Sequence, residues 1–327
     1  MNLHNFINDL NKKTPFSGFI GFNEPMANHT SYRTGGPADL LVRPDKDVFP
    51  AWTPAMLRAA KAEDIPVFVL GGGANILVSD KGIRGIVLDT GSWEGVEEPL
   101  LPGNPAPAAG HGSSNQGGLL VKVLSGTLVD TLTENLAGRG LSGMEFLAGM
   151  PGTVGGAVWM NARCYGKSVS DQLALVEILD ENLETVPVPF CERDFSYKKS
   201  PFQNRNILIL SAVFRVFPRD ASDILKTMAE HRQDREEKGH YRFPSAGSVF
   251  KNNHAFGEPS GKIIADLGLK GLGIGGAQIA SWHGNLIVNK GNASSMDIRL
   301  LMDEVVKRVK EEKGLSLENE VLLIGDW

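Results

Sequence analysis

The chain has few cysteines and no long apolar run, and these absences argue against a disulfide-rich or membrane-spanning protein. Only two of its 327 residues are cysteines, Cys164 and Cys191, and their spacing fits neither a metal site nor a disulfide framework. Such usage is typical of a reducing compartment. The longest apolar run, at 207–213, is too short to cross a bilayer, and the N-terminus has no apolar core of the signal-peptide kind. We therefore expect a soluble, cytoplasmic protein without a membrane partner.

An excess of basic residues is also missing. Lysine and arginine number 33 against 38 aspartates and glutamates, which gives a formal net charge of −5. The chain thus has no basic footprint for nucleic acid, and an anionic ligand must be held by local donors rather than by overall charge. We expect no nucleic-acid partner, and the acidic, unrepetitive sequence is compatible with a monomer.

Several common catalytic motifs are absent as well. There is no HExxH motif, no CxxC pair and no Ser/His/Asp pattern, so metal hydrolases and proteases find no support and no metal site is expected. The triplet in VFVLGGGANILVSD is not a Walker loop, which needs Lys-Ser/Thr where Ala74 and Asn75 stand. It is not a Rossmann fingerprint either, because Ile76 replaces the third glycine and a strand-like segment follows.

The elements that remain mix helices and strands without a regular βαβ period, which favours an α+β fold. Residues 92–118 are rich in proline, glycine and serine and lack periodicity, so they predict a surface loop or mobile insertion. A change of character near residue 218 predicts a domain boundary. The expected helices are an N-terminal one with Leu3, Phe6, Ile7 and Leu10 on one face, 55–62 started by Thr53-Pro54, one capped by Thr127, 221–238 and 295–313. The expected strands are 65–70, short strands within 76–88 broken at 80–82 and at Gly85, 175–179, 184–188, 207–216 and 321–324.

Two glycine-rich stretches carry the first chemical signal. Gly71, Gly72 and Gly73 follow an expected strand, and consecutive glycines let backbone N–H groups converge on a pyrophosphate. The segment GMPGTVGGAVWMNA repeats the theme, with Thr153 as a further donor. Either stretch alone is better explained by a tight turn or close packing. Together they favour a cofactor, because a long dinucleotide needs several such backbone cradles.

Three side chains become candidates only in context. Ser248 lies in PSAGSVFKN, in a glycine turn where a serine is usually structural. Glu320, in LENEVLLIG, has apolar neighbours; burial there would raise its pKa and keep it protonated, although most such glutamates face solvent. Lys198, in FSYKKS, is on its own an ordinary surface lysine.

Seven blocks in order make the sequence resemble the UDP-N-acetylenolpyruvoylglucosamine reductases, also called UDP-N-acetylmuramate dehydrogenases, in their shorter class. The resemblance runs from Asn28 to Gly325 and leaves out mainly residues 92–118. Any one block would be weak evidence, but seven in the correct order are strong. The blocks are NHTSYRTGGPAD, VLGGGANILVSDKGIRGIVL, LSGMEFLAGMPGTVGGAVWMNA, FSYKKSPF, PSAGSVFKN, PSGKIIADLGLKGLGIGGAQIASWHGNLIVN and LENEVLLIG.

This resemblance implies a fold and a reaction. The fold is a two-subdomain FAD-binding fold of vanillyl-alcohol-oxidase type, residues 1–90 and 91–217, followed by a C-terminal α+β substrate-binding domain, residues 218–327. NADPH would reduce the bound FAD and leave, and a UDP-sugar would take its place. Reduction of the sugar's enolpyruvyl group would yield UDP-N-acetylmuramate for peptidoglycan, and so serve cell-wall biogenesis, cell shape and cell division.

The resemblance also assigns residues. Hydride addition to the enolpyruvyl group leaves an enolate, which Ser248 would protonate with assistance from Glu320. Tyr197, Lys251 and Asn252 would bind the substrate. The FAD would be held by Tyr32, Arg33, Thr34, Gly35, Gly71, Gly72, Gly73, Ala74, Asn75, Gly149, Gly152, Thr153, Gly155 and Gly156.

At one position the sequence departs from the family pattern. The family usually has arginine in a Tyr-Arg-x-Ser motif, where this chain has Lys198. Lysine keeps the charge but loses the fork that grips a carboxylate. Arg163 stands where the family usually has a small residue, and it could supply the missing guanidinium; a solvent-facing arginine is an equally good interpretation. Two rivals stay open: another FAD-dependent dehydrogenase of this fold, and a catalytically silent homologue that binds flavin or sugar nucleotide.

Overall fold

The structure, a computed structural model, describes residues 2–101 and 118–327. Helices and mostly antiparallel strands are mixed along the chain, which confirms the α+β class. The chain forms two compact units, each discontinuous in sequence: residues 1–20, 42–72 and 87–232 make the first, and 21–41, 73–86 and 233–327 the second. The expected division into three domains at residues 90 and 217 stays a prediction, since these units are defined by packing alone.

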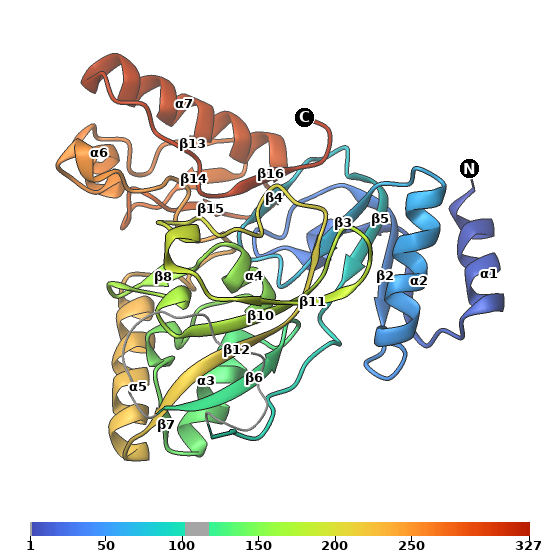
Figure 1. Ribbon diagram of the computed structural model, residues 1–327. Coiled ribbons are helices and arrows are strands. Elements are labelled where there is room, and N and C mark those ends of the chain that lie inside the picture. Colours follow the sequence, from blue (N-terminus) through green and yellow to red (C-terminus); the bar gives the residue numbers. More distant parts are fainter. Residues whose placement is uncertain (1, 102–117) are drawn as a thin grey trace. The chain divides into compact units, whose positions relative to one another are not determined.

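The first unit is built on an antiparallel sheet in the order β11-β10-β12-β6. Ala212 lies at its centre, paired with Val176 on one side and Val123 on the other. Helix α4 packs on β12 and β6, where it covers a core of aliphatic and aromatic side chains (Figure 1). The bounds are β6 (Leu119–Leu124), α3 (Val129–Gly138), β7 (Leu141–Ser142), α4 (Val154–Trp159), β8 (Arg163–Cys164), β9 (Lys167–Ser168), β10 (Leu173–Leu179), β11 (Thr185–Pro189), β12 (Leu208–Pro218) and α5 (Ala221–Glu237).

The N-terminal helix of the first unit is confirmed as α1 (Leu3–Lys13), with Phe6, Ile7 and Leu10 buried. The helix that follows was misplaced by the proline signal. Helix α2 (Phe49–Ala62) starts with Pro50 in its first turn, and Pro54 lies inside it. Pro54 cannot donate to the carbonyl four residues earlier, but the helix continues because its apolar face is fully buried. Thr53 is therefore an interior residue and not a cap.

Two further expectations in the first unit were wrong, both because the backbone of residues 95–100 forms hydrogen bonds with residues 120–127. Thr127 does not cap α3, because its hydroxyl accepts a hydrogen bond from the Gly95 amide at 2.9 Å. Residues 95–100, expected to be loop, pair with β6: the Glu97 amide donates to the Lys122 carbonyl, and Leu100 and Leu120 exchange two bonds of 2.9 Å. Such backbone pairing needs no hydrophobic alternation, so no pattern of side chains predicts it. The remainder of the expected insertion, residues 102–117, lies outside the described residues.

The second unit is organised by helix α7, which packs along β13, β14 and β15 (Figure 1). Its expected bounds are confirmed, because Ser294 and Asp297 form a capping box and Gly314 ends the helix at φ +69°. The aliphatic side chains on its inner face are each worth about 1.5–3 kcal/mol when buried. The elements are β4 (Ile76–Val78), α6 (Ser260–Asp266), β13 (Gly273–Ile274), β14 (Ala277–Ile279), β15 (Ile287–Asn289), α7 (Ser295–Lys313) and β16 (Leu322–Ile324), with β16 parallel to β4.

A further sheet has the strand order β1-β2-β5-β3. Its strands are β1 (Gly18–Pro25), β2 (Pro37–Pro44), β5 (Ile83–Asp89) and β3 (Val67–Leu70). The break expected at Gly85 is wrong, because β5 continues through that residue, whose amide donates to an Asp39 carboxylate oxygen at 3.0 Å. No helix in the described part of the chain is both long and apolar enough to cross a membrane.

Two histidines of the second unit lie close together in an environment that disfavours their charged forms. The ring centroids of His240 and His283 are 6.0 Å apart. Burial lowers the pKa of His240 to about 4, and the positive charges of Arg235 and Lys238 and the neighbouring His283 act in the same direction, while Asp234 opposes them. His240 is therefore neutral in the folded protein near pH 7.

We predict that lowering the pH from 7 towards 4 reduces the unfolding temperature, and that His240→Gln weakens this dependence. In the unfolded chain His240 has its ordinary pKa of 6.5 and takes up a proton in this window, whereas the folded protein resists protonation until about pH 4. The stabilisation is thus present above pH 6.5 and is lost as the pH falls. Thermal melts between pH 4 and 7.5 measure it; equal slopes for the variant and the wild type would contradict the account.

Candidate functional site

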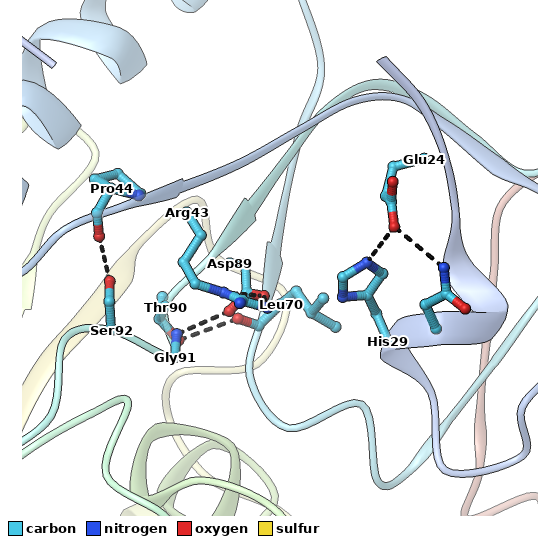
Figure 2. A network of polar contacts seen from close by, with 10 residues as sticks. Glu24, His29, Arg43, Pro44, Leu70, Asp89, Thr90, Gly91 and Ser92 are labelled. Carbon is cyan, nitrogen blue, oxygen red and sulfur yellow. Dashed lines mark hydrogen bonds and ion pairs between the residues drawn. The ribbon is translucent and has the colours of Figure 1, made fainter. Parts of the chain in front are cut away.

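The first glycine loop, residues 71–75, follows β3 and is held at its start by the first unit. Both the amide and the hydroxyl of Thr90 donate to the Leu70 carbonyl at 3.0 Å (Figure 2). The loop then passes very near a second backbone. A Cβ on Gly71 would lie 2.6 Å from Thr153 Oγ1, and one on Gly72 would lie 2.7 Å from Gly152 Cα. Only glycine fits at these two positions, and the two predicted loops therefore lie in contact.

The next glycine anchors the loop in the second unit. Gly73 has φ +61°, and a Cβ there would lie 1.9 Å from the His29 carbonyl oxygen. The Ser31 amide donates to the Gly73 carbonyl at 3.0 Å. The segment that receives the loop is itself fixed, because the His29 ring contacts Glu24 Oε1 at 2.9 Å (Figure 2). The sequence blocks around residues 28–35 and 71–75 therefore meet, as their joint assignment to a cofactor requires.

The loop has a chemical consequence, because five consecutive main-chain amides lack an internal acceptor. Within residues 2–101 and 118–327, no oxygen accepts a hydrogen bond from the N–H groups of residues 71–75. Gly73 is buried, and buried N–H groups are seldom left without a partner. A run of N–H groups without side chains in the way forms a concavity that binds anions. The loop therefore fits a phosphate or pyrophosphate group.

The second glycine loop is hydrogen-bonded by an acidic side chain, that of Asp130. The Gly149 amide donates to Asp130 Oδ1 at 2.8 Å, and Arg232 Nη2 lies 2.8 Å from the same oxygen. Burial alone would raise the pKa of Asp130, but the hydrogen bonds from Arg232 and Gly149 outweigh it and lower the pKa. Gly155 is buried against Ser125, where a Cβ would be 2.9 Å from the serine Cβ. These two glycines have packing reasons of their own, and their cofactor role stays a prediction.

The segment assigned to FAD at residues 32–35 is partly a core segment. The Tyr32 ring is fully buried in the core of the second unit, and this burial raises the pKa of its hydroxyl. Thr34 is also buried, and its hydroxyl has no partner among the described residues. Arg33 is exposed at φ +55°, and Gly35 adopts φ +129°. Arg33 and Thr34 thus have polar groups available to a ligand, whereas the Tyr32 ring serves packing.

Ser248 and Glu320 are brought together within the second unit, although they are far apart in sequence. The Glu320 amide donates to the Val249 carbonyl at 2.7 Å, so the two candidate residues lie on adjoining segments. Glu320 is 9% exposed. Its carbonyl accepts a hydrogen bond from Asn75 Nδ2 at 3.1 Å. The backbone of one residue, Glu320, therefore links the first glycine loop to the segment that carries Ser248.

The two candidate substrate residues after Ser248 already have protein partners. Lys251 forms an ion pair with Glu318, and its amide donates to the Glu318 carbonyl at 2.8 Å. Asn252 accepts a hydrogen bond from the amide of Ser260, the first residue of α6, at 2.9 Å. Both contacts stiffen the chain beyond Ser248, and a role of either side chain in substrate binding stays a prediction.

Lys198 lies in a tight turn of the first unit that is attached to the end of α4. Ser196 and Lys199 exchange two backbone bonds of 3.2 and 3.0 Å, and Lys198 itself has φ +58°. Asn161 Nδ2 donates to the Ser196 carbonyl at 2.9 Å. A lysine at positive φ is uncommon and costs about 1–3 kcal/mol. Tyr197, its neighbour in the turn, is 38% exposed and accessible to a ligand.

Arg163 belongs to the same unit and follows Asn161 by two residues. It starts the short hairpin β8–β9, is exposed, and its Nη1 lies 3.4 Å from Ser168 Oγ. A single long hydrogen bond leaves the guanidinium free to turn toward a ligand. The geometry does not choose between Lys198 and Arg163.

Three side chains that organise these segments were missed by sequence reasoning. Asp130 braces the second glycine loop, Asn161 holds the Lys198 turn, and Asn285 hydrogen-bonds the main chain next to Ser248. All three act on backbone groups distant in sequence. The only available sign was a polar residue at the edge of an apolar stretch, which is also the commonest place for a surface residue.

Two protein families match separate parts of the chain. Residues 53–186 match the family described as FAD binding domain, and residues 239–324 match UDP-N-acetylenolpyruvoylglucosamine reductase, C-terminal domain. The first match includes both glycine loops but not residues 28–35, which contact the first loop. The second match includes Ser248 and Glu320.

Similar full-length proteins are known. The chain is 42% identical to UDP-N-acetylenolpyruvoylglucosamine reductase from Treponema denticola, with 95% of each chain covered, and 37% identical to that of Bacillus subtilis, with 94% and 95% covered. A crystal structure of the reductase from Thermus caldophilus matches with a TM-score of 0.72 at 30% identity, covering 95% of this chain and 100% of that one. The resemblance expected from the seven sequence blocks is confirmed: the chain belongs to the UDP-N-acetylenolpyruvoylglucosamine reductase family.

Proposed function

We propose that this protein reduces the enolpyruvyl group of UDP-N-acetylenolpyruvoylglucosamine to give UDP-N-acetylmuramate, a precursor of peptidoglycan, with bound FAD and with NADPH as the reductant. The observation that carries the proposal is the run of five amides at residues 71–75 that have no acceptor among the described residues, in a loop that contacts the second glycine loop. It lies in a stretch that matches an FAD-binding family. We further propose a cytoplasmic monomer that binds neither nucleic acid nor membranes.

The residues present fit FAD on structural grounds. The amides of residues 71–75 would hold the pyrophosphate, with the Thr34 hydroxyl, buried and without a partner among the described residues, as a further donor. Side chains on Gly71 and Gly72 would collide with the second loop and not with a ligand, so these glycines keep the loop in the shape that presents its amides. When bound, FAD supplies a hydride carrier between NADPH and the enolpyruvyl ether.

The chain's own residues must stabilise charge and deliver a proton. Addition of hydride to the methylene carbon of the enol ether places negative charge on the adjacent carbon and its carboxylate. A cation, Lys198 or Arg163, would bind this carboxylate and favour the charged transition state. Lysine acts as a point charge, whereas arginine can grip both carboxylate oxygens.

Ser248 would then transfer its hydroxyl proton to the carbanion, which completes the addition of one hydride and one proton. A serine hydroxyl is a weak acid, so the transfer depends on a strongly basic carbanion in contact with it. The backbone bond between Val249 and Glu320 supports a role for the glutamate in this step, in which it would stabilise the enolate or help to return a proton to the serine.

A glycine substitution tests the loop. We predict that Gly72→Ala abolishes most FAD binding, because the new Cβ would meet Gly152 Cα at 2.7 Å and force the loop to move. Gly138→Ala is the matched control: nothing lies within 4 Å of a Cβ there, at the end of helix α3, and we expect full FAD content with a stability change of at most about 1 kcal/mol. The flavin-to-protein absorbance ratio measures both. Normal FAD content in Gly72→Ala would refute the role given to this loop.

A second prediction separates the two half-reactions. In Ser248→Ala, we expect NADPH to reduce the flavin at the wild-type rate, because this step needs no proton from the serine. Reoxidation of the reduced flavin by the enolpyruvyl substrate should slow by about 10²–10⁴-fold. Stopped-flow absorbance of the flavin measures each step. Wild-type reoxidation in Ser248→Ala would show that another group delivers the proton.

The competing cations can be compared by the same assay. If Arg163 supplies the missing guanidinium, Arg163→Ala should slow reoxidation by the substrate, and Lys198→Ala should have the smaller effect. Loss of one charge-stabilising donor is worth about 3–4 kcal/mol, or on the order of 10²–10³-fold in rate. Exposed Arg193→Ala, in a different turn of the same unit, is the control and should react normally. If Arg163→Ala reoxidises at the wild-type rate, the compensation idea is wrong.

A wild-type protein that binds flavin but consumes no NADPH with this substrate would instead favour a silent homologue.

A further inference from the structure

The main chain next to Ser248 is bonded by a single buried side chain, that of Asn285. The Phe250 amide donates to Asn285 Oδ1 at 2.9 Å, and Asn285 Nδ2 donates to the Phe250 carbonyl at 2.8 Å. The Asn285 main-chain carbonyl accepts a third bond, from the Val249 amide, at 3.0 Å. Asn285 is only 3% exposed. All three bonds lie within two residues of Ser248.

On the side of Leu286, the side-chain amide takes the place of a partner strand. Ser248 is paired with Leu286 and Phe250 with Asn319, each as an isolated bridge, and regular pairing on the Leu286 side would continue with a backbone partner for the N–H and C=O of Phe250. The asparagine supplies both the acceptor and the donor that such a partner would give. Phe250 is 1% exposed, so water cannot readily replace these bonds, and a buried polar group left unpaired is costly.

Asn285 is itself held in place by a hydrogen bond to a histidine. Its amide donates to His283 Nδ1 at 3.1 Å. A main-chain N–H can only donate, so His283 Nδ1 must be unprotonated, and the neutral ring carries its proton on Nε2. The bonds therefore form a relay from His283 to Asn285 and on to Val249 and Phe250, entirely within the second unit.

We propose that Asn285 is a positioning residue for the proton donor Ser248, and that the Nδ1 acceptor of His283 holds Asn285 in place. The inference rests on the proposed function of Ser248 and extends it. Asn285 bonds Val249 and Phe250, which follow Ser248 in the chain, and the Glu320 amide bonds the Val249 carbonyl. Two separate segments therefore hold the backbone next to the serine. Neither Asn285 nor His283 needs to touch the substrate.

Packing and positioning are separable at this site. The side chains of Val249, Phe250 and Leu286 are almost fully buried, and they supply the apolar contacts that keep the segment folded. The hydrogen bonds of Asn285 add a fixed backbone orientation to this apolar packing. Its removal should leave a folded segment whose serine is misplaced, and a displacement of about 1 Å at a reacting group costs on the order of 10²-fold in rate.

The experiment uses the FAD-loaded protein and Asn285→Ala. We expect flavin reduction by NADPH at the wild-type rate and reoxidation by the enolpyruvyl substrate slowed by about 10²-fold. The solvent deuterium isotope effect on reoxidation should rise, because a misplaced donor makes proton transfer limit the rate. Val305→Ala is the matched control, since it removes buried volume from helix α7 in the core that includes Val249 and Phe250 without removing any of these hydrogen bonds. It should lower the melting temperature and leave both half-reactions and the isotope effect unchanged.

A second pair of variants covers the case in which Asn285→Ala fails to fold. His283→Leu removes the Nδ1 acceptor and should slow reoxidation in the same direction, whereas His283→Gln offers an amide oxygen in its place and should restore part of the rate. Slow reoxidation with normal reduction, and rescue by glutamine, support the inference.

The failures are distinguishable. If Ser248→Ala is slow but Asn285→Ala and His283→Leu reoxidise normally, or lose both half-reactions alike, the positioning role is overturned and the function of Ser248 stands. If Ser248→Ala itself reoxidises at the wild-type rate, the role of Ser248 fails, and the inference falls with it.

Discussion

The backbone of Glu320 joins two segments of the second unit that are distant in sequence. Its N–H donates to the Val249 carbonyl and its carbonyl accepts from the side chain of Asn75. One residue therefore links the end of the anion-binding loop to the segment of the proposed proton donor. The two bonds belong to successive peptide planes that meet at the Glu320 Cα, so a shift of either segment strains the bond to the other. This link gives a physical reason why a cofactor loop and a catalytic serine distant in sequence can act in one reaction.

The glycine loop meets a second constraint in the first unit. Gly72 passes so near Gly152 that no β-carbon fits between them. The N–H groups of residues 71–75, which have no acceptor among the described residues, gain one when an anion binds. The acidic chain, with a net charge of −5, would otherwise repel a pyrophosphate. Local donors overcome the overall charge here.

Much of this could be predicted from the sequence, but only where local chemistry decides the structure. Helix α7 was predicted to the residue because its capping box and terminal glycine are local signals. Helix α2 was not, because its true start has no side-chain cap, whereas Thr53-Pro54 inside the helix has the pattern of a cap followed by proline. The pairing of Gly95 and Leu100 with β6 depends on backbone groups that carry no side-chain pattern.

The candidate site divides in the same way. The glycine loops, Ser248 and Glu320 could be found because the family resemblance aligns them, whereas their roles could not be derived from the residues alone. Asn161 and Asn285 act by bonding the main chain of distant segments, and no periodicity or spacing reveals such partners. The positive φ of Lys198 is likewise a tertiary property, since nothing in FSYKKS requires it.

Amide hydrogen exchange of the FAD-free protein, followed by mass spectrometry with and without added cofactor, tests the central claim most directly. The account predicts that FAD slows exchange across residues 71–75 and, through the two backbone bonds of Glu320, across 318–322. Riboflavin, which lacks the pyrophosphate, should give much weaker protection of 71–75. Unchanged exchange at residues 71–75 on addition of FAD, or equal protection by riboflavin, would contradict it.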